Sequence, residues 1–155
     1  MQMMITFFLI AFLVILDQIV KFWTVNVLKV NGPIKVWPDV FHLTYVENRG
    51  AAFGMLQNRQ WLFVVITIIV LIAIIIYWRH IPNDKIGKWT KIALLFTISG
   101  AIGNLIDRVR LGFVVDMFYF KLIDFPVFNV ADVCVVTGTI LLIPLMLLSE
   151  DKKSE

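Results

Sequence analysis

WLFVVITIIVLIAIIIYW, residues 61–78, indicates the class of this protein, because the segment contains no charged residue. An α-helix needs about 20 mostly apolar residues to cross the roughly 30 Å hydrocarbon core of a bilayer. Trp61 begins the segment, and Tyr77 and Trp78 end it, as expected for aromatic residues at the two membrane interfaces. The segment is therefore predicted to be a transmembrane helix.

The composition of the whole chain agrees with a membrane protein. Of its 155 residues, 60% are hydrophobic and only 16% are charged, and the mean hydropathy is +0.88. A soluble domain of this length could not bury so much apolar surface. The net charge of +3 is small and the basic residues are scattered, so no nucleic-acid partner is expected.

The residues that usually bind metals or form disulfides are few. Cys134 is the single cysteine, so the chain has no internal disulfide, and no CxxC or His/Cys cluster suggests a metal site. His42 and His80 are far apart in sequence, and we interpret both as surface or interfacial residues rather than ligands. No metal or cofactor is expected.

Three further spans are predicted outward from this segment. The four spans are roughly residues 5–27, 61–78, 89–108 and 129–148. The first resembles a signal-peptide core, but no basic residue precedes it and no small-x-small cleavage site follows, so we expect an uncleaved helix. Pro144 predicts a kink in the last span. Four spans place both termini on the same side of the membrane.

The link between the first two spans predicts a small surface β-element at roughly residues 30–56. Turn signals at Asn31-Gly32 and Pro38-Asp39 border IKVW and VFHLTYV, which are rich in β-branched and aromatic residues. A glycine-bearing turn is expected at residues 48–54. The mostly apolar link 109–128 is expected to lie along the membrane interface or fold back toward the helices.

The distribution of basic residues gives only a weak indication of orientation. Nearly equal numbers flank the two sides of the predicted bundle. The compact basic loop 79–91 favours the cytoplasmic side for itself and for both termini.

Polar residues in the first and third spans suggest a site inside the bundle. Gly100, Asn104 and Arg108 have i, i+4, i+8 spacing and therefore share one helix face. They form either a packing seam with interfacial charges or a set of hydrogen-bond donors pointing into the bundle. Asp17 and Lys21 have the spacing and order of an intrahelical ion pair, which we interpret as structural.

Two aspartates have the properties of a hydrolytic pair. Asp132 follows Asn129 by three residues, a spacing that also fits a helix cap helped by the helix dipole. Asp116 is flanked by Val, Val, Met and Phe, which would solvate a carboxylate poorly. Two neighbouring carboxyls that share a proton can activate water and protonate an amide. Sequence spacing alone does not show that Asp116 and Asp132 lie close together in space.

The chain resembles the lipoprotein signal peptidase (signal peptidase II) family of bacterial membrane aspartic peptidases in five blocks of sequence that occur in the same order. The blocks are DQIVK at 17–21, ENRGAAFG at 47–54, SGAIGNLIDR at 99–108, GFVVDMF at 112–118 and FNVADV at 128–133. The resemblance implies an all-α polytopic fold in which one domain has four transmembrane helices and a small extracytoplasmic β-element. It also implies cytoplasmic termini and an active site toward the extracytoplasmic face of the cell membrane.

The resemblance further implies removal of the signal peptide from diacylglyceryl-modified prolipoproteins, with cleavage just before the lipidated cysteine. Its catalytic pair falls on Asp116 and Asp132, and Asp17 and Lys21 match a structural motif. The supporting positions are Asn48, Gly50, Gly100, Asn104, Arg108 and Asn129. Expected partners are the prolipoprotein substrate, membrane lipids and the inhibitor globomycin, and the protein is expected to be a monomer.

Three positions depart from the family's pattern: Val20 replaces a small hydroxyl residue, Met117 a phenylalanine and Val133 a serine. These departures concern the pocket and leave the aspartate pair intact. Two other functions also use intramembrane charges. A transporter or proton-conducting subunit is disfavoured because the sequence shows no inverted repeat or paired broken helices. A non-enzymatic assembly factor would use the polar residues only for packing.

Overall fold

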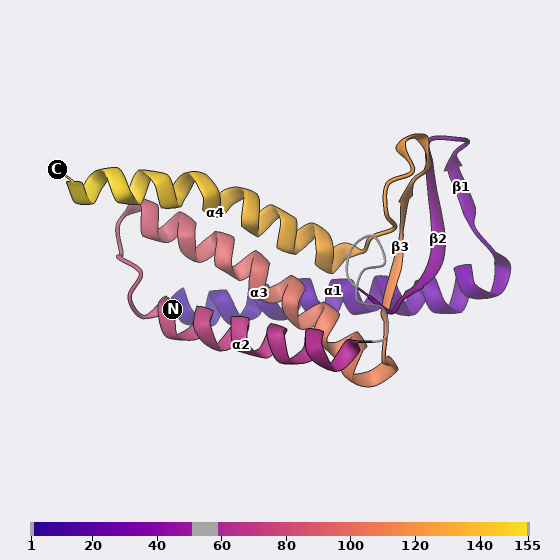
Figure 1. The fold of residues 1–155 in the computed structure, drawn as a ribbon, viewed down its shortest axis with the longest axis horizontal. Coiled ribbons are helices and arrows are strands. Elements are labelled where there is room, and N and C mark those ends of the chain that lie inside the picture. Colours follow the sequence, from indigo (N-terminus) through magenta and orange to yellow (C-terminus); the bar gives the residue numbers. More distant parts are fainter. Residues whose placement is uncertain (1, 51–58, 155) are drawn as a thin grey trace.

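Four long helices and a small antiparallel sheet make up the protein in the computed structural model, which describes residues 2–50 and 59–154 (Figure 1). The helices are α1 (Gln2–Asn31), α2 (Gln60–Trp78), α3 (Lys85–Leu111) and α4 (Val130–Ser154). Each contains a segment long and apolar enough to cross a membrane. The prediction of a membrane protein with four spanning helices is confirmed.

The ends of α3 are set by residues that satisfy free backbone groups. The side chain of Asp84 accepts a hydrogen bond from the Gly87 amide at 2.8 Å. At the other end, Gly112 adopts φ 75°, and its amide donates to the Arg108 carbonyl at 3.1 Å. This left-handed conformation suits glycine and ends the helix two residues before the next strand.

Helix α3 lies at the centre of the helical bundle. Helix α4 packs along its length, α1 packs on another side, and α2 packs chiefly on α3 and lies away from α4 (Figure 1). None of the residues of α2 is buried, although the helix is almost wholly apolar. Such a surface fits a helix that faces lipid.

Glycines allow α3 and α4 to approach closely. A Cβ atom at Gly100 would collide with the carbonyl oxygen of Ala131, and one at Gly138 would collide with the side chain of Thr97. Small residues commonly permit such close contact between membrane helices. Gly100, predicted to support the site, therefore lies in the contact between α3 and α4.

The sheet has the strand order β1-β2-β3 and is antiparallel throughout. Its strands are β1 (Ile34–Trp37), β2 (Phe41–Asn48) and β3 (Val114–Phe120). The first two fall within the predicted surface β-element. The third was not predicted, since the link 109–128 was expected only to lie along the interface or fold back. It pairs with β2 so that Asp116 lies opposite Val46 and Val114 opposite Asn48.

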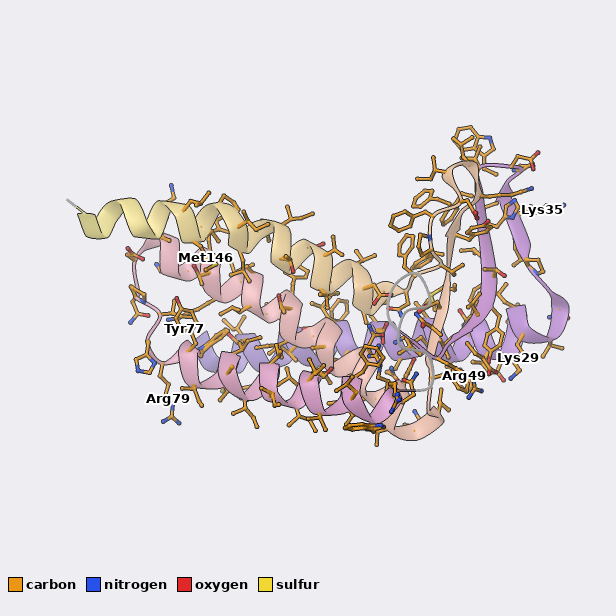
Figure 2. The ribbon with its side chains drawn as sticks, viewed as in Figure 1. Lys29, Lys35, Arg49, Tyr77, Arg79 and Met146 are labelled. Carbon is orange, nitrogen blue, oxygen red and sulfur yellow. The ribbon has the colours of Figure 1, made fainter. Side chains whose placement is uncertain are left out.

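The sheet lies at one end of the bundle, beside the last turns of α1 (Figure 1). Leu28 of α1 packs against Val115 and Met117 of β3, and all three are buried. After β3, a single 3-10 turn, η2 (Lys121–Ile123), returns the chain toward α4. Lys29, Lys35 and Arg49 lie at this end in Figure 2, and Tyr77 and Arg79 lie at the other, as expected for spanning helices with polar ends.

Candidate active site

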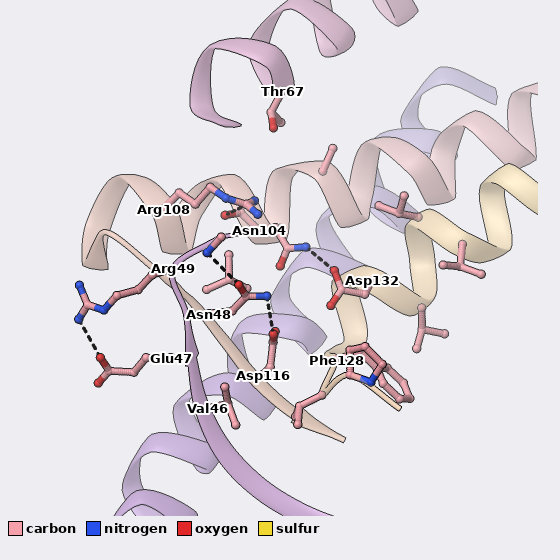
Figure 3. Close-up of a pocket in the computed structure, with 18 of the residues that line it drawn as sticks. Val46, Glu47, Asn48, Arg49, Thr67, Asn104, Arg108, Asp116, Phe128 and Asp132 are labelled. Atoms are coloured by element: carbon pink, nitrogen blue, oxygen red, sulfur yellow. Dashed lines mark hydrogen bonds and ion pairs between the residues drawn. The ribbon is translucent and has the colours of Figure 1, made fainter. Parts of the chain in front are cut away.

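A cavity of about 850 Å³ lies over α3, between α2, α4 and the sheet. Its polar lining includes Asn48, Asn104, Arg108, Asp116 and Asp132, which Figure 3 shows together. The wall deeper in the bundle is mostly apolar and includes Ile66, Val70, Ala101, Val133 and Val136. A mostly apolar cavity with a few converging polar groups is typical of a ligand-binding site.

Asp116 reaches the cavity because side chains alternate along β3. Its neighbours Val115 and Met117 face α1, and Asp116 itself is only 1% exposed. Its two oxygens accept hydrogen bonds from the Nδ2 atoms of Asn129 at 2.6 Å and Asn48 at 2.9 Å. Burial, reinforced by the negative charge of Asp132, raises the pKa of Asp116 to about 7. Asp116 therefore retains a proton up to nearly neutral pH.

Asp132 lies in the first turn of α4. Its carboxylate accepts hydrogen bonds from Asn104 Nδ2 at 2.7 Å and from the Asn129 amide at 3.1 Å. The Asp132 amide in turn donates to Asn129 Oδ1 at 2.9 Å. These two reciprocal hydrogen bonds have the form of a capping box. Asp132 therefore both caps α4 and lines the cavity.

Asn129 joins the two aspartates. It is fully buried, and its Nδ2 donates both to Asp116 and to Asn104 Oδ1, the latter at 3.2 Å. Because Asn129 Oδ1 accepts from the Asp132 amide, the orientation of its side chain is fixed. Asn48 is oriented in the same way, since its Oδ1 accepts from the Gly50 amide at 3.0 Å. Asp116 is therefore held by two donors that cannot turn away freely.

A buried cluster of charges lies behind these residues. Lys21 Nζ is 3.0 Å from Asp17 Oδ2 and 3.0 Å from Asp107 Oδ2, and it donates to Asn104 Oδ1 at 2.9 Å. The three charged residues are at most 3% exposed. The Asp17–Lys21 pair predicted from the sequence is present, and Asp107 is a third member that the sequence analysis did not assign.

The two aspartates of this cluster also bind backbone amides beside the cavity. Asp17 accepts from the Ala131 amide at 2.9 Å, and Asp107 accepts from the Val115 amide at 3.0 Å. Ala131 immediately precedes Asp132, and Val115 immediately precedes Asp116. The cluster thus fixes the backbone at both cavity aspartates. The spacing of Asp107, one helical turn after Asn104, was the available sequence signal.

Arg108 lines the cavity and is incompletely hydrogen-bonded within the described residues. Its Nη1 donates to the Asn104 carbonyl at 3.4 Å, and its guanidinium lies 5.2 Å from the centre of the Phe63 ring. Its Nε is buried and has no hydrogen-bond partner among the residues that the structure describes. Gly50 also lines the cavity, whereas residues 51–54 of the predicted turn lie outside the described residues.

The arrangement is suited to acid–base chemistry on an amide. One cavity contains a carboxyl that retains its proton to about neutral pH and a second carboxyl that influences its titration. Such a pair can remove a proton from water and supply one to a leaving group. Within residues 2–50 and 59–154, no group of three His, Cys, Asp or Glu side chains is placed to hold a metal ion.

The similar proteins found by sequence comparison carry the same name. The chain is 48% identical over 144 residues to a lipoprotein signal peptidase of Clostridioides difficile (strain 630), covering 93% of this chain and 95% of that protein. It is also 48% identical over 139 residues to a lipoprotein signal peptidase of Streptococcus thermophilus (strain CNRZ 1066), covering 90% and 89%.

Two solved structures, each described as a bacterial membrane enzyme, have the same fold. One, at 2.3 Å resolution, has a TM-score of 0.84 and 34% identity, covering 96% of this chain and 90% of that chain. The other, at 1.9 Å, has a TM-score of 0.79 and 35% identity, covering 92% of both. The profile of the signal peptidase (SPase) II family matches residues 9–148. The chain therefore belongs to the signal peptidase II family, and the prediction of an aspartic peptidase is confirmed.

Proposed function

We propose that this protein removes the signal peptide from diacylglyceryl-modified prolipoproteins by cleaving just before the lipidated cysteine, with Asp116 and Asp132 as the catalytic pair. The observation that carries the proposal is that both side chains line one cavity and are joined through Asn129. The names of the relatives support the substrate class.

In the proposed reaction, Asp132 is the base and Asp116 is the acid, because burial keeps the proton on Asp116. Asp132 takes a proton from water while the water oxygen bonds to the scissile carbonyl carbon, and Asp116 protonates the carbonyl oxygen. The tetrahedral intermediate then collapses. The C–N bond breaks, Asp132 passes its proton to the leaving nitrogen, and Asp116 recovers its own proton from the intermediate's hydroxyl.

The other polar residues hold this geometry. Asn48, Asn104 and Asn129 donate to the two carboxylates, so the acid and the base keep their orientation without reorganising during the reaction. Arg108, which lines the cavity beside Asn104, orients the peptide carbonyl of the substrate. Asp17 and Lys21 act behind the site and do not contact the substrate.

The cavity also suits a substrate that comes from the membrane. Because α2 and α4 pack on different sides of α3, the apolar part of the cavity lies between these two helices. The apolar signal peptide enters there, and its cleavage site then lies at the sheet end, where water is available. A two-chain lipid anchor keeps the cysteine at that interface.

We place the protein in the bacterial cytoplasmic membrane, with both termini in the cytoplasm and the cavity toward the extracytoplasmic face. The sheet and the ends of α3 and α4 that carry the site lie at the same end of the bundle, opposite the loop after α2 (Figure 1). We infer that residues 1–155 form one membrane-embedded domain, that the monomer is active, and that globomycin inhibits it.

The test is to replace each aspartate by asparagine, which has the same shape but cannot exchange a proton. Purified Asp116→Asn and Asp132→Asn variants are each expected to release signal peptide from a diacylglyceryl-modified prolipoprotein at least about 100-fold more slowly than the unchanged protein. The matched control is Asp124→Asn, an exposed aspartate of the same end outside the cavity lining. Near-normal turnover by either folded cavity variant would rule out the proposed pair.

A further inference from the structure

The face of the sheet that carries Asp116 continues outward as an aromatic surface. Because side chains alternate along a strand, Phe118 and Phe120 share the face of Asp116. On β2, Leu43 lies opposite Phe118 and Phe41 lies opposite Phe120. The strand pair therefore leads from the cavity directly into a run of rings.

Five phenylalanines, which we call the aromatic face, form this surface: Phe41, Phe118, Phe120, Phe125 and Phe128. Their ring centres form a continuous series. Phe41 lies 5.0 Å from Phe120, Phe118 lies 5.6 Å from Phe128, and Phe128 lies 5.8 Å from both Phe120 and Phe125. Backbone hydrogen bonds between Phe118 and Phe128, at 2.8 and 3.1 Å, hold the loop before α4 against the sheet.

The aromatic face is partly open and is continuous with the cavity. Phe125 and Phe128 line the cavity itself, so its wall and the outer rings form one surface. Phe120 and Phe125 are 42% and 45% exposed. The free end of the sheet also stands beyond α4 in Figure 1, on the side away from α2.

Charged side chains that flank the aromatic face have partners of their own. Lys121 Nζ is 2.6 Å from an Asp39 carboxylate oxygen, and Tyr119 donates to Asp124 at 2.6 Å. Tyr119 belongs to the opposite face of β3, where it lies against His42. The aromatic face therefore has the chemistry of a binding site for hydrocarbon.

We propose that the aromatic face binds the acyl chains of the diacylglyceryl group on the substrate cysteine. The inference rests on the proposed function. If the bond before that cysteine is cut at Asp116 and Asp132, the thioether-linked lipid begins within a few bonds of the two carboxylates. Phe118 is two residues from Asp116 along the strand, or about 7 Å. The rings are thus the first large apolar surface that the attached lipid meets.

This placement gives the enzyme a physical means of recognising lipidation. Apolar contact with the acyl chains supplies binding energy away from the scissile bond, and an unlipidated precursor leaves the rings exposed. Bulk membrane lipid would also contact exposed phenylalanines. However, its contact would not depend on what the substrate cysteine carries, and this difference separates the two occupants experimentally.

The experiment compares two synthetic lipobox peptides that differ only in the cysteine's diacylglyceryl group, one with long palmitoyl chains and one with short butyryl chains. For Phe120→Ala/Phe125→Ala in detergent micelles, we expect KM for the palmitoyl peptide to rise about tenfold. The kcat for that peptide and both constants for the butyryl peptide should stay unchanged. The Phe120→Leu/Phe125→Leu variant, which keeps apolar bulk, should recover most of the affinity.

The matched control is Leu122→Ala/Ile123→Ala. These residues are each 70% exposed beside the aromatic face but outside its ring series. Equal losses for both peptides, an equal loss in the control variant, or no loss at all would overturn the proposed site. If the unchanged protein cleaves neither peptide, the proposed function fails and this inference fails with it. Cleavage of both peptides without chain-length selectivity in the variants refutes the inference alone.

Discussion

Replacing Lys21 by methionine tests whether the buried cluster of charges is essential to the fold. Methionine keeps the length and apolar stem of lysine but removes the ammonium group. In the folded protein that group contacts Asp17, Asp107 and Asn104 at 2.9–3.0 Å. The substitution leaves two carboxylates, 1% and 3% exposed, without their shared counter-charge.

The size of the effect follows from this geometry. Removing one partner of a buried ion pair costs about 3–5 kcal/mol, because the other charge stays buried and uncompensated. Here one ammonium serves two carboxylates, so we expect the upper end, about 5 kcal/mol. For a chain of this size, that corresponds to a fall in Tm of roughly 10–20 °C. Adding Asp17→Asn removes one uncompensated charge and should restore about 2 kcal/mol.

Thermal unfolding of the purified variants in detergent provides the measurement. Lys29→Met is the matched control, since Lys29 lies on the same helix but forms an exposed pair with Glu47 at 3.3 Å. An exposed pair of this kind contributes less than about 1 kcal/mol. The reasoning is refuted if Lys21→Met unfolds within about 2 °C of the unchanged protein, or if adding Asp17→Asn lowers its stability further.

Four further predictions have defined outcomes. Since burial raises the pKa of Asp116 from 3.8 to about 7, cleavage should decline as pH rises through about 7 and the acid is lost, which a pH–rate profile measures. Asp116 ionises in the unfolded chain near pH 3.8 but in the folded protein only near 7, so stability falls as pH rises between these values and stays low above them. Inactive Asp116→Asn lacks this loss and should therefore unfold about 2 kcal/mol less readily than the unchanged protein at pH 9 in a denaturation assay. Asn48→Ala removes a hydrogen bond that lowers this pKa, so the alkaline limb should move to higher pH in the same profile. Gly138→Val should cost about 2–3 kcal/mol in thermal unfolding, because its side chain collides with Thr97.

The helices could be predicted because a membrane helix forms all its backbone hydrogen bonds within its own segment. Each span is therefore visible in the sequence without knowledge of its neighbours. Strand β3 could not be identified so readily. Residues 114–117 are buried on both faces of the sheet, which removes the polar–apolar alternation that marks a half-buried strand. Strand β2 keeps its outer residues partly exposed, and its β-branched and aromatic residues were enough to indicate a strand.

The residues of the site could likewise be predicted only in part. Asp116 and Asp132 could be selected as candidate site residues because an ionisable group in an apolar segment is costly and usually has a function. Asp107 was given no role because, beside Arg108, it resembles one of the charges that commonly end a membrane helix. Its partners are Lys21, far away in sequence, and the backbone amide of Val115. Every residue has a backbone amide, so the sequence gives no sign of which one an aspartate binds.

The buried cluster of charges and the aromatic face are connected to the two cavity aspartates in different ways. Lys21 reaches both cavity aspartates through Asp17 and Asp107, each of which holds the amide just before one of them. A change in the cluster therefore alters stability and the position of both carboxylates together. The aromatic face contacts the site from the other side and makes no hydrogen bond to either carboxylate among the described residues. If both proposed roles are correct, substitutions at the exposed rings Phe120 and Phe125 should change substrate preference and leave the hydrogen bonds to the two carboxylates in place.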